Sequence, residues 1–138
     1  MKLSDLTYQP NVYLAFVLDD ASRQQLLAAY PPDFSSVICH HVTIIYNLNE
    51  VNLEQVKPDL GTVLVTGHIS SDGVECFTAT VGGKRTRVDG GWYHVTSSVE
   101  PPKKPVDSNT LLASIGGKVS HSIDPPIELG GAFKFLPR

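Results

Sequence analysis

The sequence predicts an α+β fold, with helices packed on an antiparallel or mixed β-sheet. Short apolar runs typical of strands recur along the chain, and two segments rich in helix-forming residues interrupt them. The middle strands are separated by short turns, as in hairpins. The resulting order is strand, helix, strand, hairpins, helix and strand, which is typical of the α+β class. The length of 138 residues suits a single domain over residues 1–138.

The opening strand and helix have the clearest local signals. Residues 12–18 form a continuous apolar run with β-branched and aromatic members, which indicates a buried strand. Asp20 can cap a helix that begins at Ala21 and stops before Pro31. Gln, Leu and Ala, which favour helices, fill this segment.

The remaining elements follow from pattern and from turn residues. Strands are predicted at residues 37–48, 62–69, 74–81, 92–99 and 127–136. Residues 49–60 contain Pro58 and indicate a short helical turn or loop. Asp107 or Ser108 can cap a short helix that ends at Ile115. The Gly130-Gly131 pair predicts a bulge within the last strand.

Composition narrows the class of protein. With 41% hydrophobic and 18% charged residues the chain is globular, and its apolar runs are too short for a membrane span. The N-terminus does not resemble a secretory signal, so we expect a cytoplasmic monomer. Cys39 and Cys76 are expected to be reduced core thiols. A net charge of -3 argues against a broad grip on nucleic acid but allows a small phosphate-bearing ligand.

Two predicted strands carry the same triplet, His-Val-Thr, at residues 41–43 and 94–96. Side chains alternate along a strand, so His41 and Thr43 share one face, and His94 and Thr96 do the same. Two imidazoles and two hydroxyls can supply an acid, a base and two donors to phosphate oxygens, provided that the strands are neighbours. This combination suits phosphoryl chemistry without a metal.

A histidine followed two positions later by Ser or Thr also occurs by chance. A Ser or Thr two positions after a His is expected roughly a tenth of the time from average composition. His68 also has a serine, Ser70, two positions later, but it precedes a predicted turn and is expected at the surface.

With these triplets the sequence resembles the two-histidine (2H) phosphoesterase superfamily, which has paired His-x-Thr/Ser motifs on adjacent central strands. Tyr93-His-Val-Thr, followed by Lys104-Pro-Val-Asp-Ser-Asn, is most similar to cyclic phosphodiesterases related to the end-healing part of RNA ligases. The resemblance implies a bilobal fold, with a central cleft between the sheets and two main helices outside. It also implies catalysis without a metal or cofactor. Ser97 departs from the family pattern, which usually has an aliphatic residue there.

The resemblance also implies roles for the four residues of the triplets. His94 is assigned as general base and His41 as general acid, with the reverse assignment left open. An imidazole pKa near ~6.5 lets one ring be neutral and the other charged near neutral pH. Thr43 and Thr96 are expected to hold the non-bridging oxygens of the phosphate.

The predicted function is therefore a metal-independent phosphodiesterase acting on a nucleotide phosphodiester. The leading substrates are RNA ends that carry a 2′,3′-cyclic phosphate. One alternative is the degradation of cyclic oligonucleotide signals, as in viral anti-defence members of the superfamily. Another alternative is a non-catalytic RNA or nucleotide binder.

Other candidate binding residues are weaker. Lys84, Arg85 and Arg87 could bring positive charge to a phosphate or form a solvated hairpin tip. Trp92 is expected on the catalytic face, where it could stack on a base, whereas Tyr93 points to the core.

Other aromatic, histidine, cysteine and glycine residues are not predicted to form a binding site. Tyr13 and Phe16 are expected to pack in the core, and His40 to face away from His41 in a structural role. Cys39, His40 and His41 are contiguous, so they would point to opposite faces of a strand, and no metal site is predicted. No P-loop pattern occurs at Gly82-Gly83-Lys84 or at Gly116-Gly117-Lys118.

Overall fold

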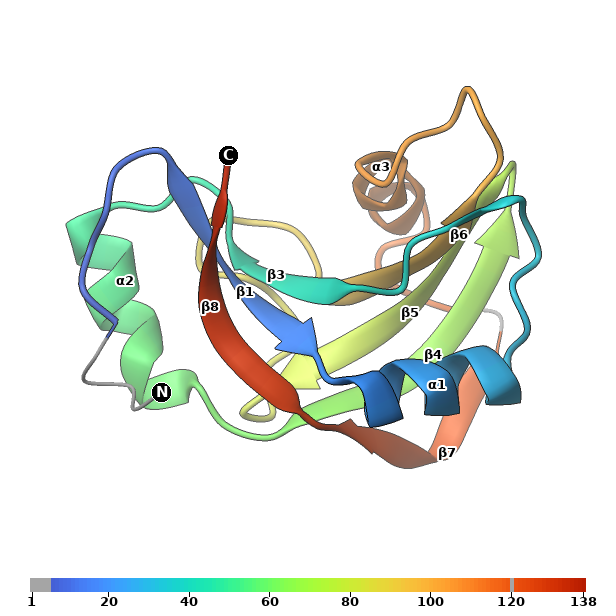
Figure 1. The fold of residues 1–138 in the computed structure, drawn as a ribbon, viewed down its shortest axis with the longest axis horizontal. Helices are drawn as coiled ribbons and strands as arrows, with labels where there is room; N and C mark the ends of the chain where they lie inside the picture. The colour runs from blue at the N-terminus through green and yellow to red at the C-terminus, as the bar shows by residue number, and fades with distance from the viewer. Residues whose placement is uncertain (1–5, 120) are drawn as a thin grey trace.

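The computed structural model describes residues 6–119 and 121–138 (Figure 1). It confirms the α+β class: the described chain forms an eight-stranded antiparallel sheet with three α-helices. The elements in chain order are β1 (Val12–Leu18), α1 (Asp20–Ala29), β2 (Ser36–Val37), β3 (His41–Ile45), α2 (Glu50–Val56), η2 (Lys57–Asp59), β4 (Val63–Ser71), β5 (Val74–Val81), β6 (His94–Val99), α3 (Asp107–Ser114), β7 (His121–Leu129) and β8 (Gly131–Pro137). Among the described residues, no helix has the length and apolar character needed to cross a membrane.

The sheet has the strand order β7-β4-β5-β6-β3-β1-β8, and the short strand β2 pairs with β6 beside this path. Most neighbours pair along their length, but β3 and β6 share a single registered pair, Val42 with Val95. The two end strands, β7 and β8, are consecutive in the chain. Only Gly130 separates the end of β7 from the start of β8, so the curved sheet brings its two edge strands together at this one corner (Figure 1).

The strand predicted at residues 37–48 is wrong in extent, because a turn divides it. Ile38 and Cys39 continue the pairing of β2 with β6, since their amides donate to the carbonyls of Ser97 and Thr96. Cys39 then takes a left-handed conformation with φ of 43°. The chain leaves β6 at this point, and β3 pairs mainly with β1.

The last predicted strand, with its bulge at Gly130-Gly131, is also wrong. β7 ends at Leu129, Gly130 is the connection, and Gly131 begins a separate strand at the opposite edge of the sheet. A Cβ at Gly130 would collide with the carboxylate of Asp19, and one at Gly131 would collide with the carbonyl of Val17. Glycine is needed because the connection passes directly against β1 and the start of α1.

Helix boundaries differ slightly from the prediction. Asp19, one residue before the predicted Asp20, caps α1 by accepting from the amide of Ser22. Residues 49–60 are more ordered than expected, because Asn49 and Asn52 form a reciprocal capping box at the start of α2. Neither Asp107 nor Ser108 caps α3.

The sheet is covered on both faces. The larger core lies on the face that α1 and α2 cover, and it includes Leu26 and Leu53 from those helices. A smaller core joins Leu112 of α3 to Ile69 and Cys76 on the opposite face. Cys39 and Cys76 are both buried and unpaired with each other. Burial on both faces explains why several strands are apolar at nearly every position.

Two adjacent serines of β6 are buried in different chemical settings. Ser97, at the position where the 2H pattern has an aliphatic residue, is fully buried, and its Oγ has no hydrogen-bond partner among the described residues. Ser98 donates to Oε1 of the buried Glu75 over 2.6 Å and accepts from the amide of Phe34. Only Ser98 therefore gains from its hydroxyl.

Replacing each of these serines with alanine should have different effects on the free energy of unfolding. Ser97→Ala is expected to leave the free energy of unfolding within about 0.5 kcal/mol of the wild type or to raise it, because no hydrogen bond is lost. Ser98→Ala should lower it by about 1–3 kcal/mol, because Glu75 loses a buried donor. Urea unfolding at pH 7 measures both changes. Equal losses in the two proteins would contradict this account of Ser97.

Candidate functional site

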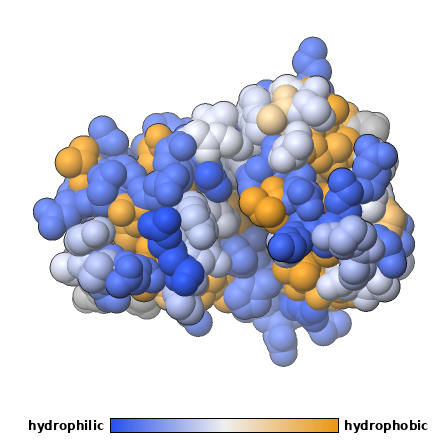
Figure 2. Space-filling model, turned by 90° about the horizontal axis from the view of Figure 1, so that it is seen from above, coloured by the Kyte–Doolittle hydropathy of each residue, from blue (hydrophilic) through white to orange (hydrophobic). Residues whose placement is uncertain are grey.

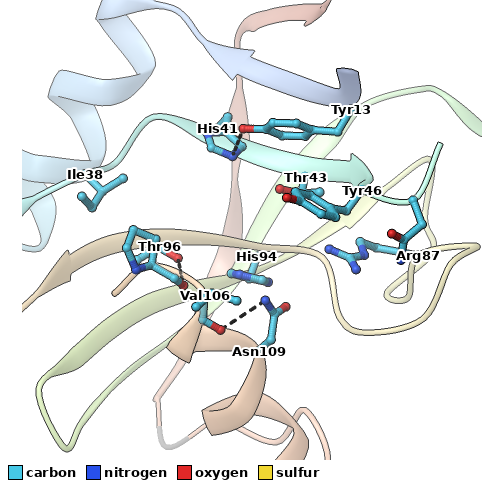
Figure 3. A pocket seen from close by; sticks show the side chains of 12 residues that line it. Tyr13, Ile38, His41, Thr43, Tyr46, Arg87, His94, Thr96, Val106 and Asn109 are labelled. Atoms are coloured by element: carbon cyan, nitrogen blue, oxygen red, sulfur yellow. Dashed lines mark hydrogen bonds between the residues drawn. The ribbon is translucent and has the colours of Figure 1, made fainter. Parts of the chain in front are cut away.

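The pairing of β3 with β6 brings the two His-Val-Thr triplets together. Val42 and Val95 are opposite each other and both point into the larger core. Side chains alternate, so the histidine and threonine of each triplet point to the other face. His41, Thr43, His94 and Thr96 accordingly line one cavity of about 430 Å³ (Figure 3). Figure 2 shows the surface hollowed in the middle of the face that is seen from above.

His94 is held in one tautomer at the floor of this cavity. Its side chain is buried, and its Nδ1 donates to the carbonyl oxygen of Trp92 over 2.8 Å. A carbonyl oxygen only accepts, so Nδ1 carries the proton and Nε2 of the neutral ring keeps a lone pair. Burial lowers the pKa of His94; the hydrogen bond to Trp92 opposes this decrease, and the positive charge of Arg87 adds to it. The neutral ring has the protonation state that a general base needs.

His41 has polar partners at both ring nitrogens. Nδ1 lies 2.9 Å from Nδ1 of His40, and Nε2 lies 3.3 Å from the hydroxyl of Tyr13. Burial lowers the pKa of His41 to about 4, and His40 and His94 contribute to the decrease. The expected ordinary imidazole pKa is therefore wrong for His41. The expectation that His40 faces away is also wrong, because His40 precedes β3 and strand alternation does not apply to it.

The two threonines differ in their surroundings. The hydroxyl of Thr96 lies 2.8 Å from that of Ser108 and 3.3 Å from the carbonyl oxygen of Pro105, so it ties β6 to the start of α3. Thr43 is half-buried at the cavity wall. We infer that Thr43 is the better placed of the two to contact a ligand.

Of the three predicted cations, Arg87 alone lines this cavity. Its Nε donates to the carbonyl oxygen of Gly90 over 2.9 Å and lies 3.0 Å from Oδ1 of Asp89. The other carboxylate oxygen of Asp89 accepts from the amides of Tyr46 and Asn47, just after β3. Asp89 thereby fixes the arginine against β3, and Figure 3 shows the guanidinium directed toward Thr43 and His94.

The other predicted binding residues lie outside the cavity. Lys84 is exposed and pairs with Asp59 over 2.8 Å. Arg85 and Trp92 line a second cavity. Trp92 was expected beside His94, but β6 begins only at His94, and Trp92 pairs instead with Thr86 across the preceding loop. Tyr93 is buried in the larger core, as expected.

Two tyrosines of the cavity wall, Tyr13 and Tyr46, were not predicted as binding residues. Tyr13 was expected to pack in the core with Phe16, yet only Phe16 does so. Tyr13 lies two residues before Ala15, which pairs with Thr43, so Tyr13 shares the face of the cavity. Its ring is 5.4 Å from that of Tyr46, measured between centroids. Knowing that β1 neighbours β3 would have identified Tyr13, because Tyr13 and Phe16 have opposite parity along the strand.

A cluster with metal-ligand chemistry occurs elsewhere, at Asp33, His68 and Glu75. Oε1 of Glu75 accepts from the amide of Asp33, and Oε2 lies 2.8 Å from Nε2 of His68. The ring of His68 also stacks on Tyr30, with 4.7 Å between centroids. The expectation of a surface His68 near a turn is therefore wrong, because β4 continues to Ser71 and Glu75 holds the imidazole against the sheet.

Comparison with known proteins supports the fold. No protein-family model matches the chain, and no curated protein matches it either. Among solved structures, it is similar to one described as the crystal structure of a fungal RNA kinase, with a TM-score of 0.58 and 12% identity. The match covers 94% of this chain and 46% of that one. The chain thus shares a fold with a segment shorter than half of that protein.

The lowered pKa of His41 predicts a pH-dependent loss of stability. An unfolded histidine takes up a proton near ~6.5, whereas folded His41 resists protonation until about pH 4. The unfolded state binds more protons between these values, so stability falls as the pH falls through this window. His41→Gln should show a smaller decrease in thermal midpoint from pH 7 to pH 4.

The exposed His121 supplies the matched control. His121→Gln should keep the wild-type dependence of the thermal midpoint on pH. If the His41→Gln and His121→Gln proteins lose stability in parallel with the wild type, His41 does not resist protonation in the folded state.

Proposed function

We propose that this protein is a metal-independent phosphodiesterase that hydrolyses a nucleotide phosphodiester, with 2′,3′-cyclic phosphate ends of RNA as the leading substrate. The observation that carries the proposal is the shared cavity of His41 and His94, with Arg87 directed into it. The fold shared with a segment of a fungal RNA kinase favours RNA as the source of the phosphate. The P-loop pattern of many kinases is absent from the sequence, and the cavity chemistry favours hydrolysis.

In the proposed reaction, Nε2 of His94 takes a proton from a water molecule. The water oxygen forms a bond to phosphorus as the bond between phosphorus and a ribose oxygen breaks. His41 donates a proton to that leaving oxygen, so a cyclic phosphate opens to a monoester and a hydroxyl. The tautomer that Trp92 imposes on His94 supports this direction over the reverse assignment.

The low pKa of His41 makes its protonation depend on the substrate. In the free protein, burial keeps the ring neutral at pH 7. An anionic phosphate beside the ring favours its charged form and raises its pKa. The substrate therefore helps to generate the acid that its own cleavage needs.

Arg87 and Thr43 are proposed to bind the non-bridging oxygens. A guanidinium held by Asp89 and Gly90 is pre-positioned, so little reorganisation is needed as charge develops on the phosphate. Tyr13 and Tyr46, on the cavity wall, offer aromatic surface to a ribose or a base. The single registered pair between β3 and β6 supports the bilobal 2H arrangement, in which each lobe contributes one histidine.

Cyclic oligonucleotide signals are the second candidate substrate. The net charge of -3 disfavours extended electrostatic contacts with the phosphates of a long RNA, which favours a small ligand. A non-catalytic nucleotide binder would use the same cavity, and turnover separates it from both enzymatic candidates.

Removing either imidazole should abolish turnover without unfolding the protein. His41→Ala and His94→Ala are each expected to lower kcat on a 2′,3′-cyclic nucleotide by about 10²- to 10⁴-fold. His121→Ala, at an exposed residue outside the cavity, serves as the control and should keep wild-type kcat. Thermal midpoints at pH 7 are measured in parallel. Full activity in either active-site variant would rule out the assigned roles.

The pH profile should be bell-shaped and displaced to acid. The pKa values of both rings are lowered in the free protein, so the maximum of kcat/KM is expected below pH 6.5. Above the maximum, the rate falls because the acid loses its proton. No carboxylate or thiol lines the cavity among the described residues, so the rate should survive EDTA. A rate that collapses with EDTA and returns with zinc or manganese would indicate a metallophosphodiesterase.

A further inference from the structure

A second cavity, of about 610 Å³, lies near the C-terminal end of α3, whereas the cavity of His41 and His94 lies near the start of that helix. Thr66 of β4 and Thr78 and Thr80 of β5 contribute to its wall. Arg85, Trp92 and Lys118 come from the segments that flank β6 and α3. Its volume falls in the range of about 300–1,000 Å³ that is usual for small-molecule sites.

The chemistry of this second cavity suits an anion. Arg85 and Lys118 are cationic, and no carboxylate lines the cavity in the described parts of the chain. Hydroxyl groups on the wall add neutral donors, and those of Thr66 and Thr78 lie 3.1 Å apart. Arg85 and Lys118 are both exposed, and neither forms a salt bridge with another residue in the described parts of the chain. An Arg and a Lys together with hydroxyls are typical of phosphate recognition.

The same cavity also offers an aromatic surface. Gly117, with φ of 73°, lies against the ring of Trp92, so that a Cβ there would be 2.9 Å from three indole atoms. This contact fixes the orientation of the indole, while the side chain stays partly exposed toward the cavity. Aromatic side chains of this kind stack on nucleic-acid bases. The cations could bind the phosphate of a nucleotide while the indole contacts its base.

The second cavity adjoins the catalytic one. Thr78, on its wall, pairs directly with His94 in the neighbouring strand. The carbonyl of Trp92 holds Nδ1 of His94. Side chains opposite each other on antiparallel strands have Cβ atoms about 4.5–5.5 Å apart. A ligand in the second cavity is therefore close enough to belong to the same substrate.

We propose that the second cavity binds a second nucleotide of the substrate, with its phosphate at Arg85 and Lys118 and its base against Trp92. This inference rests on the proposed function of the catalytic cavity. It defines the preferred substrate as at least two nucleotides joined by a phosphodiester. Both a short RNA with a 2′,3′-cyclic end and a cyclic oligonucleotide have this chemistry.

Trp92 provides a direct measurement, because it is the only tryptophan in the sequence. The His41→Ala protein, which should not consume its ligand, is titrated with three probes. These are a mononucleotide 2′,3′-cyclic phosphate, a dinucleotide with a 2′,3′-cyclic end and a cyclic dinucleotide. Tryptophan fluorescence should change with a two-nucleotide probe and stay constant with the mononucleotide. The responding probe distinguishes an RNA end from a cyclic oligonucleotide.

Charge removal then tests the phosphate contacts. Arg85→Ala and Lys118→Ala are each expected to raise the Kd of the two-nucleotide probe about tenfold. In the otherwise wild-type enzyme, these variants should lower the ratio of kcat/KM for the two-nucleotide substrate over the mononucleotide by a similar factor. Lys84→Ala is the matched control, because Lys84 lies in the same loop but pairs with Asp59 outside both cavities.

The outcomes separate this inference from the proposed function. Turnover of cyclic nucleotides with no fluorescence change, and with Arg85→Ala behaving like Lys84→Ala, would overturn the second subsite and leave the phosphodiesterase standing. Absence of turnover, with a fluorescence change that depends on Arg85, would support the nucleotide site while overturning the enzymatic proposal.

Discussion

The pairing of Val42 with Val95 is the contact on which the candidate site depends. It is the single registered pair between β3 and β6, and both valines are fully buried. Their burial forces the histidines on either side of the sheet junction to point away from the core. Burying polar imidazoles in an apolar core would cost several kcal/mol, roughly 2–7 per unpaired polar group. Core packing thus sets the direction of His41 and His94.

Burial also determines the electrostatics of the cavity. Burial lowers the pKa of both His41 and His94, with smaller contributions from His40 and His94 at His41 and from Arg87 at His94. The cavity thus combines neutral imidazoles with one pre-positioned cation. The negative charge of an anionic ligand would favour the protonated form of either ring. In the proposed reaction, substrate binding and protonation are therefore coupled.

Helix α3 and the segments next to it give the face two separate chemical environments. Near its start, Thr96 and Ser108 join the helix to β6 beside the cavity of the two histidines. After its end, Gly117 covers the ring of Trp92 at the second cavity. Leu112 packs on the sheet between these points and closes the smaller core. The helix and the segment that follows it thus contribute residues to both cavities.

The sequence determined the features that depend on local pattern. The bounds of β1 and β5, the α+β class and the two triplets followed from residue type and alternation, which involve near neighbours only. Tertiary structure decided where strands diverge and which side chains meet. The turn at Cys39 and the break at Gly130 arise from contacts with distant strands. The position of Arg87 depends on Asp89, whose other carboxylate oxygen is bound by the distant amides of Tyr46 and Asn47. Such contacts join residues far apart in the chain, so periodicity along the sequence carries no record of them.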